Sequence, residues 1–316
     1  MLKLADSWIW DSWYVFDGEN YHAFYLRASR ALGNPDRRHR NPYVGHAISK
    51  DLTNWTVVAD AIAISDPPAF DSWTTWTGST VRADDGTWWM FYTGTSREDG
   101  GDYQRIGAAT SRDLMTWTKV SSQALTEPDP KWYETLDLNI WHDQAWRDPW
   151  VFKTDDGIWH MFVTARANTG EAFDRGVLGH ATSKDLLNWE VQPPLTEPGS
   201  GFGQMEVFQV EVVDGVPTLL WCSGYRELSD ASKAKFGEYK SGGMFSATGE
   251  TVLGPFDIEN STRFPHPSIY AARIVQYKGE WFMLGFRDHE ENGFVGELTD
   301  PIPVTSIKGQ GLVPRK

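Results

Sequence analysis

A hairpin signal recurs five times along the chain at nearly even spacing. In each instance an apolar stretch runs into a short polar turn that ends in glycine, and an aromatic-rich stretch follows. Asp-Gly and Lys-Gly between alternating apolar runs are typical of β-hairpin turns. Units of this size predict a structure built from repeated small sheets. The turn glycines are Gly18, Gly86, Gly157, Gly215 and Gly279, which are 68, 71, 58 and 64 residues apart.

A second phrase follows the hairpin in the first three units. It reads SKDLTNW at 49–55, SRDLMTW at 111–117 and SKDLLNW at 183–189. The phrase predicts the end of a third strand, a turn formed by Ser and Asp side chains, and a Trp that packs back on the strand. Because a propeller blade is a four-stranded sheet, the five units predict an all-β, five-bladed β-propeller. No Pro- or Ser-rich linker interrupts them, so residues 1–316 are expected to form a single domain.

Composition narrows the class of ligand. The net charge is −14 and the acidic residues are scattered, which argues against nucleic acids and anionic membranes as partners. One cysteine, Cys222, and the lack of a signal peptide predict a cytoplasmic protein. Neither a metal-binding spacing nor a phosphate loop is present, so no metal or cofactor is expected. The 17 tryptophans fit either sugar stacking or a Trp-rich β-core.

Three carboxylates occupy corresponding places ahead of the turns. The first strand of each unit is expected to line the central channel, and Asp11, Asp148 and Glu206 lie on three of these strands. Taken singly, Asp148 also fits a turn before Pro149, and Glu206 fits a solvated strand position. Taken together, they predict a site, because two carboxylates flanking a glycosidic bond serve its hydrolysis. Arg147 is expected to help keep Asp148 ionised.

The motifs around these residues resemble those of a known clan of glycosidases. They are WDSW at 10–13, Gly78-Ser79 after Trp76, Arg147-Asp148-Pro149, and IYAAR at 269–273. In these motifs the chain resembles the five-bladed propellers of glycoside hydrolase families 32 and 68, the invertase and levansucrase clan, with family 43 as a relative. One motif differs, since Glu206 is followed by Val-Phe where the two families have Cys-Pro or Arg-Pro. The C-terminal β-sandwich usual in family 32 is not expected within these 316 residues.

The resemblance implies a retaining glycoside hydrolase that acts on β-fructofuranosides of the sucrose or fructo-oligosaccharide type. By this resemblance Asp11 is the nucleophile, Glu206 is the acid/base, and Asp148 binds fructose hydroxyls and stabilises the transition state. The expected ligand is a small carbohydrate, and the oligomeric state is left open. The side chains expected to contact the sugar are Trp10, Trp13, Trp76, Ser79, Arg147 and Tyr270.

Three other functions stay open at this stage. A fructosyltransferase differs only in how well water is excluded from the acceptor site. A family 43-like arabinofuranosidase or xylosidase inverts, which predicts carboxyl groups about 6.5–9.5 Å apart instead of about 5–5.5 Å. The altered motif after Glu206 also fits a non-catalytic sugar-binding propeller. Specificity is expected to depend on the loops at 28–42, 96–104, 121–145 and 225–242.

Several further residues carry weaker expectations. His142 and the run 287–289 are candidates for the rim of the site, and loop 121–145 for one of its walls. His46 and His180 recur at equivalent repeat positions outside the inner strands, so a structural role is expected for both. Cys222 has no neighbouring histidine motif and is expected in the core.

Overall fold

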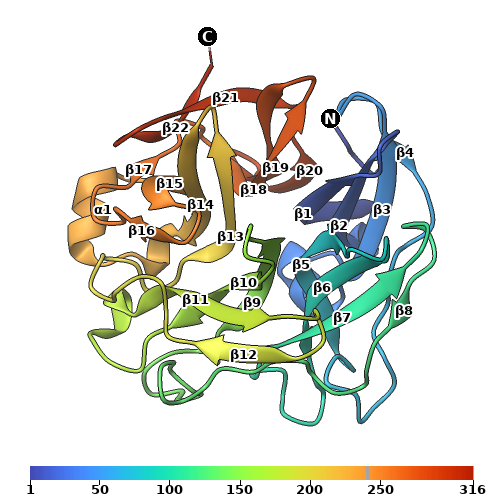
Figure 1. The fold of residues 1–316 in the computed structure, drawn as a ribbon, viewed down its shortest axis with the longest axis horizontal. Helices are drawn as coiled ribbons and strands as arrows, with labels where there is room; N and C mark the ends of the chain where they lie inside the picture. The colour runs from blue at the N-terminus through green and yellow to red at the C-terminus, as the bar shows by residue number, and fades with distance from the viewer. Residues whose placement is uncertain (240–241, 316) are drawn as a thin grey trace.

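The computed structural model describes residues 1–239 and 242–315, and it contains five antiparallel sheets set around a central axis (Figure 1). The predicted five-bladed propeller is therefore confirmed. Each of the first three blades is one sheet whose strands follow in chain order. They are β1 (Ser7–Phe16), β2 (Tyr21–Ser29), β3 (Tyr43–Ser49) and β4 (Thr56–Val57); β5 (Thr74–Arg82), β6 (Trp88–Thr95), β7 (Arg105–Ser111) and β8 (Thr118–Lys119); and β9 (Trp146–Lys153), β10 (Trp159–Arg166), β11 (Gly176–Ser183) and β12 (Trp189–Gln192).

The fourth and fifth blades depart from this pattern at their outer strands. In the fourth, β17 pairs with β15 beside β16, and in the fifth the β20 segment is inserted before the outer strands. This departure explains why the third-strand phrase is missing from the last two units. The strands are β13 (Glu206–Val213), β14 (Val216–Gly224), β15 (Gly242–Thr251), β16 (Gly254–Phe256) and β17 (Thr262–Arg263); and β18 (Ile269–Tyr277), β19 (Glu280–Glu290), β20 (Gly293–Leu298), β21 (Ile302–Ile307) and β22 (Gly311–Pro314).

Helical segments are short and lie in the connections. One α-helix, α1 (Asp230–Phe236), is capped by the Ser229 side chain, and it lies in the loop expected at 225–242, of which residues 240 and 241 are outside the described part. Among the described residues, no helix is long and apolar enough to span a membrane. The 3-10 helices are η1 (Arg30–Leu32), η2 (Pro35–Arg40), η3 (Ala172–Asp174) and η4 (Tyr225–Glu227).

The repeated Ser-x-Asp-Leu-x-x-Trp phrase forms the turn that its residues predict. In blade 1 the Asp51 carboxylate accepts hydrogen bonds from the backbone amides of Thr53 and Asn54, at 2.9 and 2.7 Å. Leu52 has a φ of 61°, a left-handed conformation that this side-chain bonding stabilises. The Trp55 indole then donates to the Leu52 carbonyl at 3.0 Å. The same bonds recur in blades 2 and 3.

The tryptophan of this turn also packs against a neighbouring blade. Trp117 of blade 2 meets Phe24 of blade 1 edge-on, with ring centroids 5.6 Å apart. Trp189 of blade 3 meets Phe91 of blade 2 in the same way, at 5.4 Å. The phrase therefore joins successive blades in addition to closing a strand, because each of these indoles packs against a buried phenylalanine of the preceding sheet.

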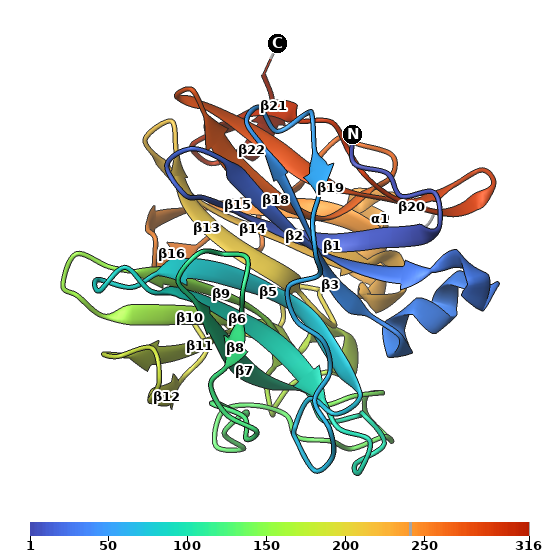
Figure 2. The same cartoon turned by 90° about the vertical axis from the view of Figure 1, so that its right-hand side faces the viewer.

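The ring closes between blades 5 and 1 without a shared sheet. The Leu298 amide donates to the Leu2 carbonyl at 3.0 Å, and the Tyr21 hydroxyl donates to the Gln276 carbonyl at 2.8 Å. The helical segment at 30–40 also lies against the β19–β20 hairpin, and Figure 2 shows both projecting on the same side of the molecule. Blade 5 and the N-terminal strands are thereby held together by a backbone hydrogen bond, a side-chain hydrogen bond and loop contacts.

Candidate active site

The first strand of every blade lines the centre, and each of these strands has a β-bulge near its N-terminal half. The register of pairing shifts next to Ile9 in β1, Trp76 in β5, Glu206 in β13 and Tyr270 in β18, and it shifts opposite Thr164 in β9. A bulge inserts an extra residue and turns side chains away from the regular alternation. The five bulges together direct polar side chains toward one end of the channel.

Backbone strain accompanies three of these bulges. Asp148, Val207 and Ala271 have φ values of 59°, 55° and 43°, which L-residues rarely adopt. A β-branched Val in this region is an outlier, and such strain persists only where the surroundings enforce it. Val207 directly follows Glu206, so the strain lies where the family motifs have Cys-Pro or Arg-Pro. The strained backbone thus sets the direction of the Glu206 side chain.

Asp11 lies on β1 and is half-buried. The Thr77 hydroxyl of β5 donates a hydrogen bond to its carboxylate. Burial raises the pKa of Asp11 to about 6; the Thr77 bond opposes this shift, and the negative charge of Glu206 adds to it. Asp11 is therefore ionised above about pH 6. The carboxylate of the WDSW motif can lie among tryptophans because its hydrogen-bond donor, Thr77, comes from the neighbouring blade.

Asp148 is the most buried of the three carboxylates, with 5% of its side chain exposed. The Thr164 hydroxyl donates to it at 2.8 Å, and its own amide donates to the Thr93 hydroxyl at 2.9 Å. Burial raises the pKa of Asp148 to about 7, although the Arg147 guanidinium acts in the opposite direction. The expectation that Arg147 keeps Asp148 ionised is thus correct in sign, but burial outweighs it.

Glu206 is the first residue of β13 and joins three blades through its partners. Its carboxylate accepts hydrogen bonds from the Arg147 guanidinium of β9 and from the Tyr270 hydroxyl of β18. Arg147 lies between Glu206 and Asp148, with its Nε 3.4 Å from an Asp148 oxygen. Although burial opposes its charge, the carboxylates of Glu206, Asp143 and Asp148 raise the pKa of Arg147 well above its ordinary value.

A supporting frame of amides holds Arg147 in place. Its guanidinium donates to Gln104 at 2.9 Å and to Gln204 at 3.0 Å, and both amides donate to the carboxylate of Asp143. Asp143 belongs to loop 121–145, and it brings this loop to the edge of the site. The sequence patterns did not point to Gln104, Asp143 or Gln204, because the contacts of the two glutamines with Arg147 span 43 and 57 residues.

Some of the residues expected to contact a sugar lie in the site, and others lie in the core. Arg147 and Tyr270 contact Glu206 directly, and Trp76 is half-buried with its indole bonded to the His39 carbonyl. Trp13 is fully buried and donates to Thr80, and the buried Ser79 accepts from the Val151 amide. Trp13 and Ser79 therefore join the inner strands together and do not present their polar groups to a ligand.

The segment around η2 adds basic and aromatic groups that the sequence motifs did not identify. Trp10 is buried at 3% exposure, and its ring lies 6.4 Å from that of His39. The buried Arg38 places its guanidinium 5.7 Å from the Trp10 ring centre and 3.9 Å from that of Phe294. Its positive charge is among the influences that lower the pKa of Asp11. In the sequence, the basic run Arg-Arg-His-Arg at 37–40 was the feature that could have indicated positive groups near the site.

Glu227 is a further residue that no sequence motif identified. It lies in η4 after β14, and its carboxyl accepts from the Gly224 amide at 3.1 Å. Burial, followed by the negative charge of Glu206, raises the pKa of Glu227 to about 8. A neutral carboxyl group beside the cluster therefore supplies a hydrogen-bond donor at neutral pH.

Of the remaining candidate residues, one lies at the edge of the site and the others lie in the core. His142 is exposed and lies 3.7 Å from Asp143, at the edge of the Arg147 frame. His46 pairs with His22 at 2.9 Å inside blade 1, and His180 pairs with His160 at 2.9 Å inside blade 3. Both pairs are buried in their sheets, which agrees with the structural role expected for them. The buried Cys222 also lies in the core as expected.

No group of three or more His, Cys, Asp or Glu residues within 1–239 and 242–315 is arranged to hold a metal ion. The site is instead a set of carboxylates, one arginine and several hydroxyls. Such groups bind polyhydroxylated ligands and carry out proton transfer and nucleophilic attack. The fold and the site together define a five-bladed β-propeller with an acidic cluster at one end of its channel.

Comparison with known proteins identifies the family. The model of the glycosyl hydrolases family 32 N-terminal domain matches residues 11–291, and the chain belongs to this family. It is 26% identical over 306 residues to the beta-fructofuranosidase, insoluble isoenzyme CWINV6, of Arabidopsis thaliana, covering 89% of this chain and 52% of that protein. It is 27% identical over 194 residues to the 6(G)-fructosyltransferase of Asparagus officinalis, covering 59% of this chain and 28% of that protein. The chain thus spans about half the length of the first of these relatives, and less of the second.

Solved structures share the fold across nearly the whole chain. The inulosucrase of Halalkalicoccus jeotgali, bound to kestose, superposes with a TM-score of 0.80 at 18% identity, covering 99% of this chain and 91% of that one. Bacillus subtilis levansucrase gives 0.75 at 16% identity, covering 99% and 87%. The GH32 beta-fructofuranosidase of Bombyx mori gives 0.74 at 20% identity, covering 97% and 62%. These likenesses establish the propeller architecture.

Proposed function

We propose that the protein hydrolyses β-fructofuranosides with retention of configuration. The observation that carries the proposal is the convergence of Asp11, Asp148 and Glu206 from three blades. Arg147 pairs with both Asp148 and Glu206, and the negative charge of Glu206 acts on Asp11. Family membership supports the reaction class, and the names of the curated relatives, beta-fructofuranosidase, fructan 1-exohydrolase and fructosyltransferase, support the fructosyl group. The structurally similar inulosucrase was solved bound to kestose, which supports a small carbohydrate ligand.

In the first step an Asp11 oxygen attacks the anomeric carbon of the fructosyl unit. Glu206 donates a proton to the glycosidic oxygen as the bond to the leaving sugar breaks. Asp11 is ionised above about pH 6, which suits a nucleophile at neutral pH. Tyr270 and Arg147 hold the Glu206 carboxyl in position for proton transfer. Arg147 also offers charge that balances the cluster while the proton moves.

In the second step Glu206 removes a proton from a water molecule, and the water oxygen attacks the same carbon. Asp11 then leaves as a carboxylate, and free fructose is released. Asp148 is placed to accept hydrogen bonds from fructose hydroxyls and to stabilise the positive charge that develops on the ring. Its hydrogen bond from Thr164 and its strained backbone fix the direction of its side chain.

Product analysis tests the proposal against a transferase. The protein is incubated with sucrose, and glucose, fructose and oligomers are measured separately. Equal glucose and fructose support the hydrolase, whereas glucose in excess together with oligomers supports fructosyl transfer. An inverted product would point to a family 43-like mechanism instead.

Substitution of the nucleophile tests whether the propeller is catalytic. Asp11→Ala is expected to lower turnover by on the order of 10⁴-fold or more, because the covalent step loses its attacking group. Asp84→Ala serves as the matched control, because the Asp84 side chain is 82% exposed and pairs with Lys153 on the surface. A wild-type protein that binds sucrose without turnover, and whose Asp11→Ala variant binds equally well, would instead support a sugar-binding propeller.

A further inference from the structure

Arg166, the last residue of β10, is a buried arginine outside the proposed reaction steps. Only 1% of its side chain is exposed, and its guanidinium forms two bonds with the Glu134 carboxylate, at 2.7 and 3.3 Å. It also donates to the carbonyl of Ala172, at 3.0 Å, and to that of Gly203. The Trp141 ring covers the guanidinium, with 3.7 Å between the ring centre and the guanidinium carbon. An arginine can hold all these groups at once because its donors form a rigid planar fork whose face stacks on aromatic rings.

Two of these partners belong to the segments that hold Arg147. Trp141 lies two residues before Asp143, and Gly203 lies directly before Gln204. The Gln204 amide donates to the Asp143 carboxylate at 3.1 Å. Both side chains accept from the Arg147 guanidinium, at 3.4 Å for Asp143 and 3.0 Å for Gln204. The buried guanidinium at the end of β10 therefore fastens together the two chain segments that supply the frame of Arg147.

The contact between these two segments is close-packed. The Gly203 amide donates to the Glu227 carbonyl at 2.7 Å. A Cβ atom at position 203 would lie 2.7 Å from that carbonyl oxygen and 2.8 Å from the Trp141 ring, closer than a real Cβ atom approaches its neighbours. Residue 203 therefore has to be glycine. Because the Trp141 ring packs against both the Arg166 guanidinium and this backbone, a shift of the guanidinium is passed to both segments.

Arg147 carries the effect to the proposed acid/base. Its guanidinium donates to the Glu206 carboxylate, and its Nε lies 3.4 Å from an Asp148 oxygen. Thr164, which donates to Asp148 at 2.8 Å, lies two residues before Arg166 on the same strand. Proton transfer requires the donor and acceptor atoms to lie about 2.6–3.2 Å apart. A displacement of about 1 Å can cost on the order of 10²-fold in rate, so small movements of this frame affect catalysis.

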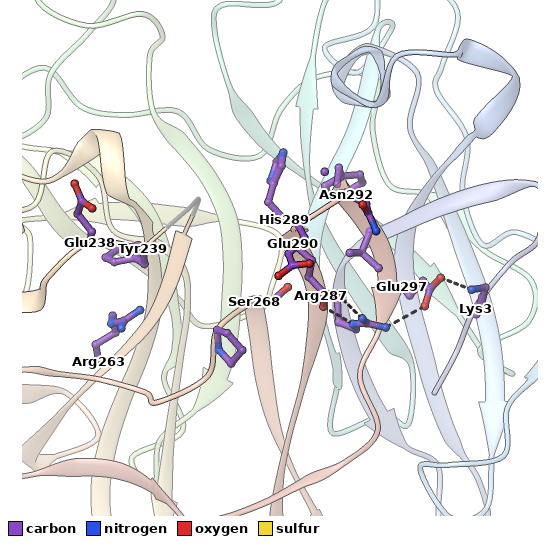
Figure 3. Close-up of a pocket in the computed structure, with 15 residues that line it drawn as sticks. Lys3, Glu238, Tyr239, Arg263, Ser268, Arg287, His289, Glu290, Asn292 and Glu297 are labelled. Atoms are coloured by element: carbon purple, nitrogen blue, oxygen red, sulfur yellow. Dashed lines mark hydrogen bonds and ion pairs between the residues drawn. The ribbon is translucent and has the colours of Figure 1, made fainter.

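Another arginine fork in the molecule serves one hairpin only. Figure 3 shows Arg287 beside a pocket between blades 4 and 5, where it pairs with Glu290 at 2.7 Å and with Glu297 at 3.5 Å. All three residues belong to the β19–β20 hairpin. The partners of Arg166 come instead from loop 121–145, from η3 and from the segment before β13. Only the second arrangement joins parts of the chain that meet at the catalytic cluster.

We propose that Arg166 is a positioning residue for proton transfer by Glu206, and that it acts through Arg147. This inference rests on the proposed function. The hydroxyl bound to Asp11 comes from Thr77 in blade 2, which is outside this network. A change at Arg166 is therefore expected to weaken protonation of the leaving group more than nucleophilic attack.

The identity of the leaving group separates these two effects. Values of kcat/KM are measured for sucrose and for para-nitrophenyl β-fructofuranoside. The sugar alcohol leaves readily only when its oxygen is protonated, whereas nitrophenolate leaves as a stable anion. Loss of acid catalysis therefore lowers kcat/KM for sucrose selectively. Glu206→Gln sets the scale, with an expected loss on the order of 10²-fold or more for sucrose and less than about tenfold for the aryl fructoside.

Arg166→Lys is the test variant, because lysine keeps a positive charge beside Glu134 but lacks the planar fork. We expect kcat/KM for sucrose to fall by roughly tenfold, mainly through kcat, and that for the aryl fructoside by less than about threefold. Trp141→Leu removes the stacked ring and leaves the ion pair. It is expected to give a selective loss of about threefold, and it covers the case in which Arg166→Lys does not fold.

Lys119→Arg is the matched control, since it is also an exchange of one basic residue for another at a buried ion pair. Lys119 pairs with the buried Asp71 on the outermost strand of blade 2, so the ratio of the two kcat/KM values is expected to stay as in the wild type. Equal losses on both substrates in Arg166→Lys and Trp141→Leu, or no loss in either, overturn the inference and leave the proposed function standing. Equal losses in Glu206→Gln, or a wild-type protein that releases no sugar from either substrate, overturn the proposed function and the inference with it.

Discussion

Replacing Asp148 by Asn is expected to stabilise the protein while removing activity. Asp148 has a left-handed φ of 59°, a conformation that Asn adopts as readily as Asp. The Asn oxygen can still accept the hydrogen bond that Thr164 donates at 2.8 Å. The substitution therefore leaves the backbone and the hydroxyl contact in place. It removes the buried negative charge and its ion pair with Arg147, which keeps its pair with Glu206.

The magnitude follows from the position of the Asp148 pKa. Burial raises it from 3.8 to about 7, so the charged form destabilises the folded protein by about 4 kcal/mol once the pH exceeds 7. Because the folded-state pKa is the higher one, this destabilisation is absent below pH 3.8 and complete above pH 7. Asp148→Asn is thus expected to raise the free energy of unfolding at pH 8 by about 2–4 kcal/mol and Tm by a few degrees.

Urea and thermal unfolding at pH 8 and pH 5 provide the assay. At pH 5 the gain is expected to fall to less than half, since folded Asp148 is then mostly protonated. Asp185→Asn is the matched control, and it is expected to lower the stability at pH 8 instead of raising it. Hydrogen bonds from Asn188 lower the pKa of this turn carboxylate to about 2, so its charged form stabilises the fold. A variant no more stable than wild type at pH 8, or a gain equal at both pH values, would refute the reasoning.

Two further substitutions test the site and its supporting loop. Thr77→Val removes the hydroxyl that stabilises ionised Asp11. The pH at which kcat/KM falls on the acid side is therefore expected to move upward from about pH 6 by about one pH unit. Thr80→Val, on the same strand, is the control and should leave this pH unchanged. Glu134→Gln, in loop 121–145, breaks a buried pair with Arg166 at 2.7 Å. It is expected to cost about 3–5 kcal/mol in urea unfolding, and a loss below about 1 kcal/mol would contradict the pairing.

The repeat pattern was enough to predict the architecture. Turn glycines and the Ser-x-Asp-Leu-x-x-Trp phrase depend on bonds within four residues, so their geometry is encoded locally. The placement of Asp11, Asp148 and Glu206 on inner strands followed from their equivalent places in the repeat. In a ring of blades, equivalent positions of the inner strands lie close together at the channel. Three residues far apart in the chain could therefore be predicted to form one site.

Side-chain direction was less predictable than position. Trp13 and Ser79 lie in motifs that resemble those of the clan, yet both are buried and bonded between the inner strands. The bulges explain this outcome, because an extra residue reverses which side chains face the channel. A sequence motif places a residue on a strand, but the local φ values decide where that residue points.

The sequence by itself determined the number of blades, the turn chemistry and the candidate carboxylates, because each depends on short-range patterns that repeat. Only the tertiary structure decided which groups surround those carboxylates. Arg147 meets Glu206 across 59 residues and Tyr270 meets it across 64, so their contacts exist only once the blades have closed into a ring. The raised pKa values of Asp11 and Asp148 have the same origin, since burial is a property of the assembled propeller.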